Sequence, residues 1–247
     1  MLIRRSTPFL LLALLVAGAQ SVAAQTPDEV LARFAKVVDP EDKIASLLGM
    51  KSTATMEMPA MGMKAAITAV QRAPNQTSVT IDLPGLGQMR QGFDGSIAWA
   101  SDPMQGPRIM SGSEAAAMAD GADFRSMTRP ASLFTSSELV GTVDLEGEKC
   151  IRLKHIWKSG RETTDCYSVA SGLLIESLSK QSSPQGEMET VQRLSDYRSV
   201  GGVMMPYKAV VSVMGMQQIV TTSAVELGAL DASLVAAPAE VIALKKP

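Results

Sequence analysis

The sequence predicts a mainly β fold with helices, of the α+β class, in which roughly a dozen antiparallel strands form a curved sheet or incomplete β-barrel. After Lys51 the hydrophobic pattern has a period of two residues, which is typical of half-buried strands. Turn signals then recur about every eight to twelve residues, the spacing expected for consecutive strands. Helical patterns occur only before this stretch and once within it. Helices are therefore expected to close an open sheet.

Residues 25–49 are expected to be helical. Thr26 can cap the helix and Pro27 suits its first turn. The apolar residues that follow have helical spacing: Val30, Leu31, Phe34, Val37 and Val38. Asp39-Pro40 is expected to divide the segment into two helices, and Gly49 to end it.

The first strands are expected to gather apolar side chains on one face. This follows if residues 59–62 form one turn and a second turn lies around Pro74. The expected facing pairs are Met58 with Met63, Met56 with Ala65, Ala54 with Ile67, Ile67 with Ile81, and Ala69 with Val79. Asp94-Gly95 predicts a further hairpin. Strict pairing across it places Trp99 opposite Arg90 on the polar face, whereas a bulge reverses this, and the sequence leaves both possible.

The strand pattern lapses over residues 101–137. Ser111 and Glu114 resemble a capping box before a short helix that ends near Gly121. Because long interruptions of a compact sheet are often binding loops, we expect a lid insertion that presents Met118, Leu133 and Phe134 to the apolar face. An ordinary surface excursion is the alternative. Strands are expected to resume over residues 138–145, 149–157, 161–169, 172–181, 187–200, 206–214 and 216–227.

The two cysteines, Cys150 and Cys166, flank an expected turn near residues 158–160. Placing them opposite each other also pairs Lys154 with Glu162, which electrostatics favours. We predict a structural disulfide in this register. A redox pair is the alternative, although the spacing is not that of a C-x-x-C motif.

Residues 1–24 have the pattern of a signal peptide. Arg4 and Arg5 precede an apolar run, and Val22-Ala23-Ala24 provides a cleavage site. The run is too short to span a bilayer, and no later run is long enough. We expect residues 25–247 to form a single domain that is periplasmic or otherwise exported, soluble after cleavage near Ala24, with no transmembrane segment.

Composition argues for an apolar ligand and against nucleic acid. Without Arg4 and Arg5, the formal net charge falls from −2 to about −4. The remaining basic residues are scattered along the sequence, so a phosphate-binding face is not expected. Hydrophobic residues make up 46% of the chain but aromatic residues only 4%, and there are 16 methionines. Such side chains can line an adaptable cavity for a flexible apolar ligand or simply fill a core.

Catalytic motifs are not found. His155 is the only histidine, and no G-x-S-x-G segment occurs. Gly85-Leu86-Gly87 lacks the third glycine of a dinucleotide loop. The chain is therefore not expected to be an enzyme or to need a cofactor.

One metal-binding alternative remains. Met56, Met58, Met61 and Met63 surround a hairpin turn, and thioethers are suitable ligands for Cu(I). Against this, apolar packing already accounts for three of them, and no His or Cys lies nearby. An envelope scaffold that binds a partner protein through a sheet edge is a further alternative.

Several segments carry a resemblance to a known family. They are Pro27 to Leu31, Gly92 to Trp99, Ser168 to Leu174, and Asp196 to Arg198 leading into Gly201 to Pro206. In these the chain resembles the outer-membrane lipoprotein-sorting family, the periplasmic lipoprotein carriers and their relatives. The chain is longer than a typical carrier, and its methionine content is unusual.

The resemblance implies an incomplete β-barrel closed by helices, which holds lipid or lipoprotein acyl chains in its hydrophobic interior without a cofactor or turnover. The residues expected to contact such a ligand are Met56, Met58, Met63, Ile67, Val79, Ile81, Met89, Met118, Leu133 and Phe134.

Overall fold

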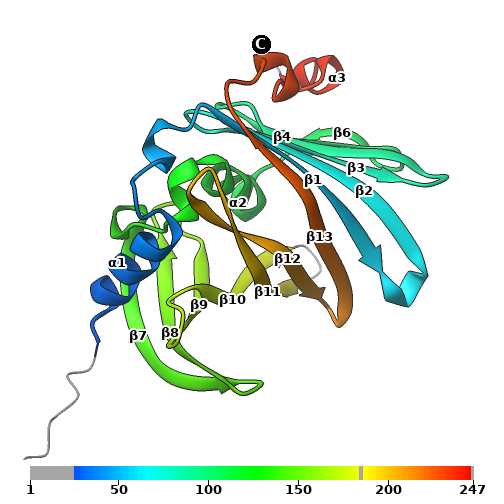
Figure 1. Cartoon of the computed structure of the whole chain (residues 1–247). Coiled ribbons are helices and arrows are strands. Elements are labelled where there is room, and N and C mark those ends of the chain that lie inside the picture. The colour runs from blue at the N-terminus through cyan, green and yellow to red at the C-terminus, as the bar shows by residue number, and fades with distance from the viewer. Residues whose placement is uncertain (1–24, 184–185, 246–247) are drawn as a thin grey trace, which may run out of the picture.

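A computed structural model describes residues 25–183 and 186–245. Its thirteen strands form one antiparallel sheet that curves but does not close (Figure 1). The expected signal peptide, residues 1–24, lies outside the described residues. Among the described residues, no helix combines the length and the apolar character needed to cross a membrane.

The strands lie in the order β6-β5-β4-β3-β2-β1-β13-β12-β11-β10-β9-β8-β7. Their bounds are β1 (Gly49–Met58), β2 (Met63–Arg72), β3 (Gln76–Leu83), β4 (Gly87–Phe93), β5 (Ala98–Asp102), β6 (Gly106–Ile109), β7 (Phe134–Leu145), β8 (Glu148–Trp157), β9 (Glu162–Ser168), β10 (Leu174–Ser183), β11 (Gly186–Val200), β12 (Val203–Val213) and β13 (Met216–Leu227). Every neighbouring pair except β1 and β13 is also consecutive along the chain. The predicted curved sheet and incomplete barrel are thus confirmed.

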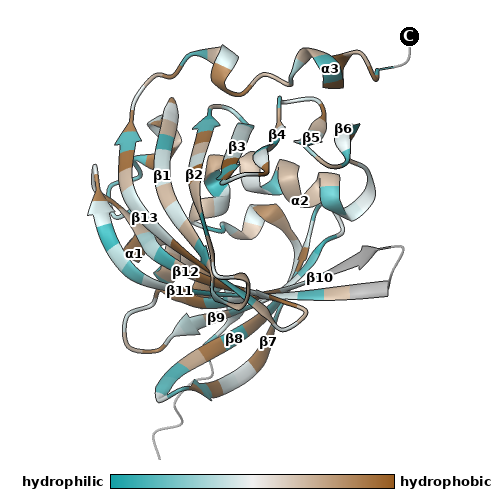
Figure 2. Ribbon diagram, turned by 90° about the vertical axis from the view of Figure 1, so that its right-hand side faces the viewer, coloured by the Kyte–Doolittle hydropathy of each residue, from teal (hydrophilic) through white to brown (hydrophobic). Residues whose placement is uncertain are grey.

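The helices connect and cover this sheet. They are α1 (Pro27–Val38), α2 (Gly112–Ala122) and α3 (Ala239–Ile242), with short 3-10 turns η1 (Ile44–Ser46), η2 (Pro59–Met61), η3 (Phe124–Met127), η4 (Ala131–Leu133) and η5 (Ala232–Leu234). Because β6 and β7 lie at opposite edges, residues 110–133 must bridge the opening between them. We call residues 110–133 the crossover segment. Figure 2 shows its helix α2 in the space around which the sheet curves.

Helix α1 begins and packs as its sequence predicts. The Thr26 hydroxyl accepts a hydrogen bond from the Glu29 amide, and the Glu29 carboxylate accepts one from the Thr26 amide. This reciprocal cap satisfies two amides at the helix start. The buried face of α1 packs in the main core with β8, β9 and β12; its residues are Val30, Leu31, Phe34 and Val38. After Asp39 the chain forms only the 3-10 turn η1 before β1 begins.

The first predicted pairings are all present. Met58 faces Met63, Met56 faces Ala65, Ala54 faces Ile67, Ile67 faces Ile81 and Ala69 faces Val79. The predicted apolar face of β1 to β3 is therefore confirmed at residue level.

The structure also establishes the position of Trp99. Trp99 lies opposite Gly92 instead of Arg90, so the pairing is shifted by two residues from the strict register. A shift of two residues keeps Trp99 on the same face of the sheet as Arg90. The C-terminal tail covers this face, so Trp99 is fully buried against Ala237 and Val241. A Cβ at position 92 would lie 2.9 Å from the Trp99 ring, which explains why glycine occupies that position.

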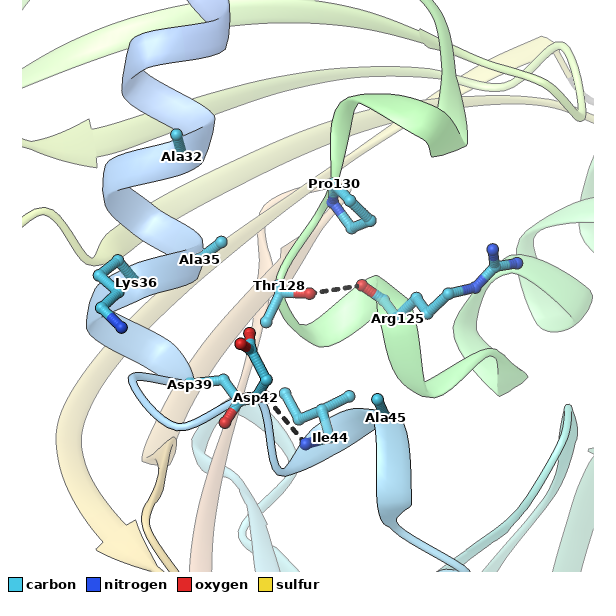
Figure 3. A pocket seen from close by; sticks show the side chains of 10 residues that line it. All are labelled: Ala32, Ala35, Lys36, Asp39, Asp42, Ile44, Ala45, Arg125, Thr128 and Pro130. Carbon is cyan, nitrogen blue, oxygen red and sulfur yellow. Dashed lines mark hydrogen bonds between the residues drawn. The ribbon is translucent and has the colours of Figure 1, made fainter.

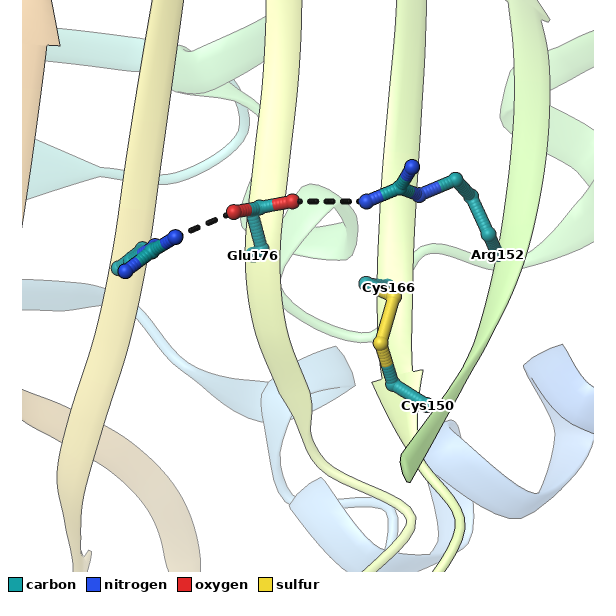
Figure 4. Close-up of a disulfide and its surroundings, with 5 residues drawn as sticks. Cys150, Arg152, Cys166 and Glu176 are labelled. Carbon is teal, nitrogen blue, oxygen red and sulfur yellow. Dashed lines mark hydrogen bonds and ion pairs between the residues drawn. A yellow bond between two sulfur atoms is a disulfide. The ribbon is translucent and has the colours of Figure 1, made fainter. Parts of the chain in front are cut away.

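The disulfide Cys150–Cys166 forms, but in a different register from the one predicted (Figure 4). Cys150 lies opposite Ser168 and Cys166 opposite Arg152, so the cysteines are diagonal neighbours. The turn is the reason. Residues 158–160 make a three-residue loop with Gly160 at φ 84°, which shifts the pairing by two residues. Lys154 still reaches Glu162 diagonally, with 2.7 Å between Nζ and Oε2.

Replacing both cysteines by serine should lower the free energy of unfolding by about 3 kcal/mol, because the bond closes a loop with a sequence separation of 16. Denaturant unfolding with and without reductant measures this. Reductant should destabilise the parent protein and leave the double variant unchanged. Equal sensitivity of both proteins would contradict a structural disulfide.

Candidate functional site

The concave face of the sheet carries a half-buried apolar surface. Rows of facing residues cross several strands: Leu194, Ala209, Val220, Met56 and Ala65 form one row, and Ala54, Ile67, Ile81 and Met89 form another. Directly opposite residues of antiparallel strands point to the same side of a sheet. The concave face is thus lined mainly by aliphatic and methionine side chains.

Most of the residues expected to bind a ligand lie on this face and retain access to solvent. Met56 is buried. Met58, Met63, Ile67, Val79 and Ile81 are half-buried, and Met89 is exposed. Val211 and Val220 from β12 and β13 extend the same surface, although sequence reasoning did not include them.

Helix α2 packs against one part of the concave face and leaves pockets beside it. One pocket of about 400 Å³ lies between α2 and β3–β4, where Met118 and Ala117 face Val79 and Gln91. A second pocket of about 150 Å³ lies among β3 to β6, where the apolar Ile81, Met89 and Ala100 line it together with polar residues that include Arg90, Asp102 and Arg108. The structure therefore brings Met118 together with Val79, as expected, while Ile81 and Met89 line the separate, smaller pocket.

Leu133 and Phe134 lie elsewhere. Phe134 is the first residue of β7, is 7% exposed, and stacks on the His155 ring with 4.2 Å between centroids. Leu133 packs against the same main core. These two side chains support the sheet beneath α1 and do not line the pockets beside α2. In addition, residues 101–102 and 106–109 of the predicted insertion belong to the paired strands β5 and β6, which the turn at 103–105 joins.

Polar contacts tie α2 to strands on both sides of the opening. The Asp120 carboxylate accepts hydrogen bonds from Ser159 Oγ at 2.7 Å and Arg161 Nε at 3.0 Å. From the other side, Gln71 Nε2 donates to the Gly121 carbonyl at 2.8 Å. Burial lowers the pKa of Arg161, and the Asp120 carboxylate opposes that shift. The helix is thus held across the barrel by a few polar contacts.

The start of α2 differs from the predicted capping box. Ser111 occupies the cap position, but its side chain makes no capping hydrogen bond. Glu114 instead forms a two-pronged ion pair with Arg108 of β6, with both distances 2.6 Å. This ion pair lowers the pKa of Glu114. The first turn of α2 is therefore fixed to the adjacent edge strand rather than to its own cap.

The crossover segment ends in a buried ion pair. Arg129, with φ 48°, contacts the fully buried Asp165 carboxylate of β9. Ser177 Oγ donates to the same carboxylate at 2.6 Å. Arg129 and Arg161 also both lie over the Trp157 ring, at 5.6 and 4.1 Å from its centroid. A continuous chain of contacts therefore runs from Asp120 through Arg161, Trp157 and Arg129 to Asp165.

His155 belongs to this buried cluster and is not arranged as a catalytic base. Burial lowers the pKa of His155 to about 4, so the ring is neutral at neutral pH. Its Nδ1 is 2.8 Å from Ser137 Oγ, while Nε2 is 3.6 Å from Asp165 Oδ2. Arg129 already neutralises that carboxylate, so it does not support a proton-accepting imidazole as in a serine hydrolase.

A further pocket, of about 370 Å³, lies between α1, η1 and the end of the crossover segment (Figure 3). The Asp39 carboxylate beside it accepts hydrogen bonds from the Lys43 and Ile44 amides, both at 2.8 Å. Thr128 Oγ1 donates to the Arg125 carbonyl at 3.2 Å. Because these polar groups already have partners, the pocket is a junction between elements and offers few free groups for a ligand.

The methionines of the proposed copper site have unequal surroundings. Met56, Met58 and Met63 lie on the concave face, whereas Met61 projects from the η2 turn and is 60% exposed. Within the described ranges, no group of three or more His, Cys, Asp or Glu residues could hold a metal ion. The geometry thus favours apolar contact for the three concave methionines.

Comparison with known proteins supports the fold. The sequence matches no protein-family model and no curated protein. Its structure is similar to that of a LolA superfamily protein from Nitrosomonas europaea, with a TM-score of 0.57 and 14% identity over 87% of this chain and 99% of that one. A DUF1329 family protein from Desulfovibrio piger gives a TM-score of 0.55 and 12% identity over 81% and 93% of the two chains.

A third similar structure is a Vibrio parahaemolyticus domain described as an outer membrane lipoprotein-sorting protein. Its TM-score is 0.54, with 10% identity over 80% of this chain and 90% of that one. Identities this low establish a shared fold. The fold implied by the sequence resemblance, that of the lipoprotein-sorting proteins, is therefore confirmed.

Arg129→Met should lower the free energy of unfolding by about 3 to 5 kcal/mol, because it leaves the Asp165 carboxylate buried without its partner. Adding Asp165→Asn should recover part of that loss. Arg125→Met is the matched control, since Arg125 pairs with Asp123 at the surface and should cost less than about 1 kcal/mol. Chemical denaturation measures all three. Equal losses for the Arg125 and Arg129 variants would contradict a dominant buried pair.

Proposed function

We propose that this protein is a non-enzymatic carrier or binding protein for a lipid or lipoprotein acyl chain, which lies on the concave face between the sheet and α2. The observation that carries the proposal is the set of half-buried aliphatic and methionine side chains on the concave face, with a pocket of about 400 Å³ beside α2. An acyl chain can replace water on such a surface at about 0.8 kcal/mol for each buried methylene. The lipoprotein-sorting fold of the similar structures supports the same role.

The residues proposed to contact the acyl chain are Met58, Met63, Ile67, Val79, Ile81, Met89 and Met118, with Val211 and Val220 added from the structure. We leave Met56 out of this set because its side chain is buried, and Leu133 and Phe134 because both are part of the main core. The signal-peptide pattern of residues 1–24 supports a periplasmic or other exported location. Native mass spectrometry of the protein purified from its cellular compartment should show lipid-sized adducts.

Ile67→Gln combined with Val79→Gln should weaken binding of a fluorescent fatty acid by roughly tenfold or more, because both changes replace apolar contacts with the chain. Thr68→Gln with Thr80→Gln is the matched control. These threonines are the next residues along β2 and β3, face each other, and point to the opposite side of the sheet. Fluorescence titration measures the affinities. Equal weakening by both pairs would place the ligand away from the concave face.

We further propose that the crossover segment acts as a lid. Its helix is Ala-rich, and of its residues only Ala122 is buried, while Ala115 and Met118 pack half-buried against Ala98, Ala100 and Met110. This limited apolar packing leaves polar contacts to complete the attachment of the helix. Entry of an acyl chain then requires the Asp120 contacts with Ser159 and Arg161 to break. Helix α2 separates the chain from water when these contacts form again.

Asp120→Ala should therefore speed both association and dissociation of a fluorescent fatty acid and increase hydrogen exchange over residues 112–122. Asp123→Ala is the control, because that carboxylate bonds to Arg125 within its own turn. Stopped-flow fluorescence and exchange mass spectrometry provide the two measurements. If Asp120→Ala leaves both rates unchanged, α2 is a fixed part of the fold rather than a lid.

A scaffold role is the second candidate, and the edge strand β7 is the observation that favours it. β7 has a free edge along 12 residues, with Leu139 and Val140 exposed. However, register shifts between Phe134 and Ser136 and between Leu139 and Gly141 interrupt the edge. Such irregularities usually prevent a strand from pairing with another chain, so the carrier role is better supported.

A further inference from the structure

Four hairpin turns along one end of the sheet expose large apolar side chains. We call these turns the apolar rim; they are residues 59–62, 84–86, 103–105 and 214–216. The exposed fractions are 60% for Met61, 51% for Leu86, 85% for Met104, 75% for Met214 and 56% for Met216. Folding leaves these side chains in water, so they do not stabilise the domain.

The sheet topology places these turns side by side. Strands β6 to β1, β13 and β12 are consecutive neighbours. The β5–β6, β3–β4, β1–β2 and β12–β13 turns therefore follow one another at the same end of the strands. Figure 1 shows the β1–β2 and β3–β4 turns along the right-hand edge of the molecule, with the β12–β13 turn below them.

The apolar rim contains no charged side chain. The nearest carboxylate in the β5–β6 turn, that of Asp102, is bonded to the amides of Met104 and Gln105 at 2.7 and 3.0 Å. The turns at the opposite end of the strands carry Asp94 and Glu146, as is usual for solvated turns. The charged residues that flank the rim turns are also paired or hydrogen-bonded: Glu57 with Lys64 at 2.7 Å, and Asp82 with Gln88 at 2.6 Å. The turns themselves therefore present apolar side chains, and charge lies only beside them.

The apolar rim is continuous with the concave face. Met58 and Met63 flank the β1–β2 turn and point to that face. The pocket lined by Ile81 and Met89 also includes Gln105 of the β5–β6 turn. The rim turns thus adjoin both the apolar concave face and a pocket of mixed lining.

We propose that the apolar rim docks on a lipid layer, with its methionine and leucine side chains inserted among the headgroups and upper acyl segments. The side chains project singly from separate turns, and methionine adapts to an irregular medium. A protein partner would require hydrogen-bonding groups across the interface, but the rim provides only Gln105 among polar side chains. The turns carry no charge, and three of the four charged residues beside them, Glu57, Asp82 and Asp102, are acidic. Apolar insertion rather than attraction to anionic lipids therefore drives docking.

Flotation with vesicles of phosphatidylcholine and phosphatidylethanolamine tests this proposal, which goes beyond acyl-chain binding. The parent protein should float with the vesicles, and high salt should not release it. Met61→Gln, Met104→Gln and Met214→Gln together should reduce the bound fraction roughly tenfold, because three apolar side chains lose their favourable insertion. Thermal unfolding monitored by circular dichroism verifies that this variant is folded.

The matched control combines Leu48→Gln, Val140→Gln and Ile242→Gln, three exposed apolar residues outside the rim, and should float like the parent. Failure of the parent to float would overturn the proposal in favour of an apolar protein partner, and equal losses in both triple variants would overturn it as well. Fluorescent fatty-acid binding in vesicle-free solution is measured in parallel and should be unchanged in the rim variant. Its absence in every protein would contradict the carrier role but not membrane docking.

Discussion

The pairing of β1 with β13 determines the arrangement of the whole domain. It joins the first and last strands of the chain, and every other neighbouring pair in the sheet is consecutive. The two free edges, β6 and β7, must then come from the middle of the chain. The close approach of the two strands requires glycine at position 49, because a Cβ there would lie only 2.7 Å from the Gly228 carbonyl oxygen. The crossover segment and its helix α2 lie across the opening as a consequence of this one pairing.

The two parts of the sheet have different interiors. One part contains the core that stabilises the fold, and the other carries the surface proposed to bind the ligand. Strands β7 to β10, together with the start of β12, pack in the main core under α1, and β8 to β10 carry a buried polar cluster in which Asp165, His155 and Ser177 are fully or largely enclosed. The half built from β1 to β4 has a concave face of half-buried aliphatic residues. Helix α2 contacts β3, β4 and β5 on one side and β10 on the other. It therefore links the strands of the main core to the strands of the open concave face.

Local sequence was sufficient to predict the β1–β3 meander. The short turn at residues 59–62 and the alternation of apolar residues determine the pairing of Met58 with Met63 and of Ile67 with Ile81. The predicted β8–β9 register was wrong because the turn is a three-residue loop, whose backbone depends on Gly160 adopting a left-handed conformation. A favourable Lys154–Glu162 pair was compatible with either register, so charge could not distinguish them.

Long-range contacts account for most of what the sequence did not predict. Trp99 is buried by a C-terminal tail more than a hundred residues later in the chain. Phe134 was predicted to be a lid residue, but it packs in the main core with α1 and stacks on His155, and neither contact is visible in the local sequence. The Arg129–Asp165 pair joins the end of the crossover segment to β9. The alternation of Thr163, Asp165 and Tyr167 on one face of a strand was the only sequence signal of that buried cluster.

Photolabelling with a diazirine fatty acid tests most directly whether the concave face holds an acyl chain. After illumination and digestion, the label should lie on β2 to β4 and on α2, at or beside Ile67, Val79, Met89 and Met118. An excess of unlabelled fatty acid should compete for these positions. Label that concentrates on the opposite face of the sheet or on β7, or that excess fatty acid fails to displace, would contradict the account.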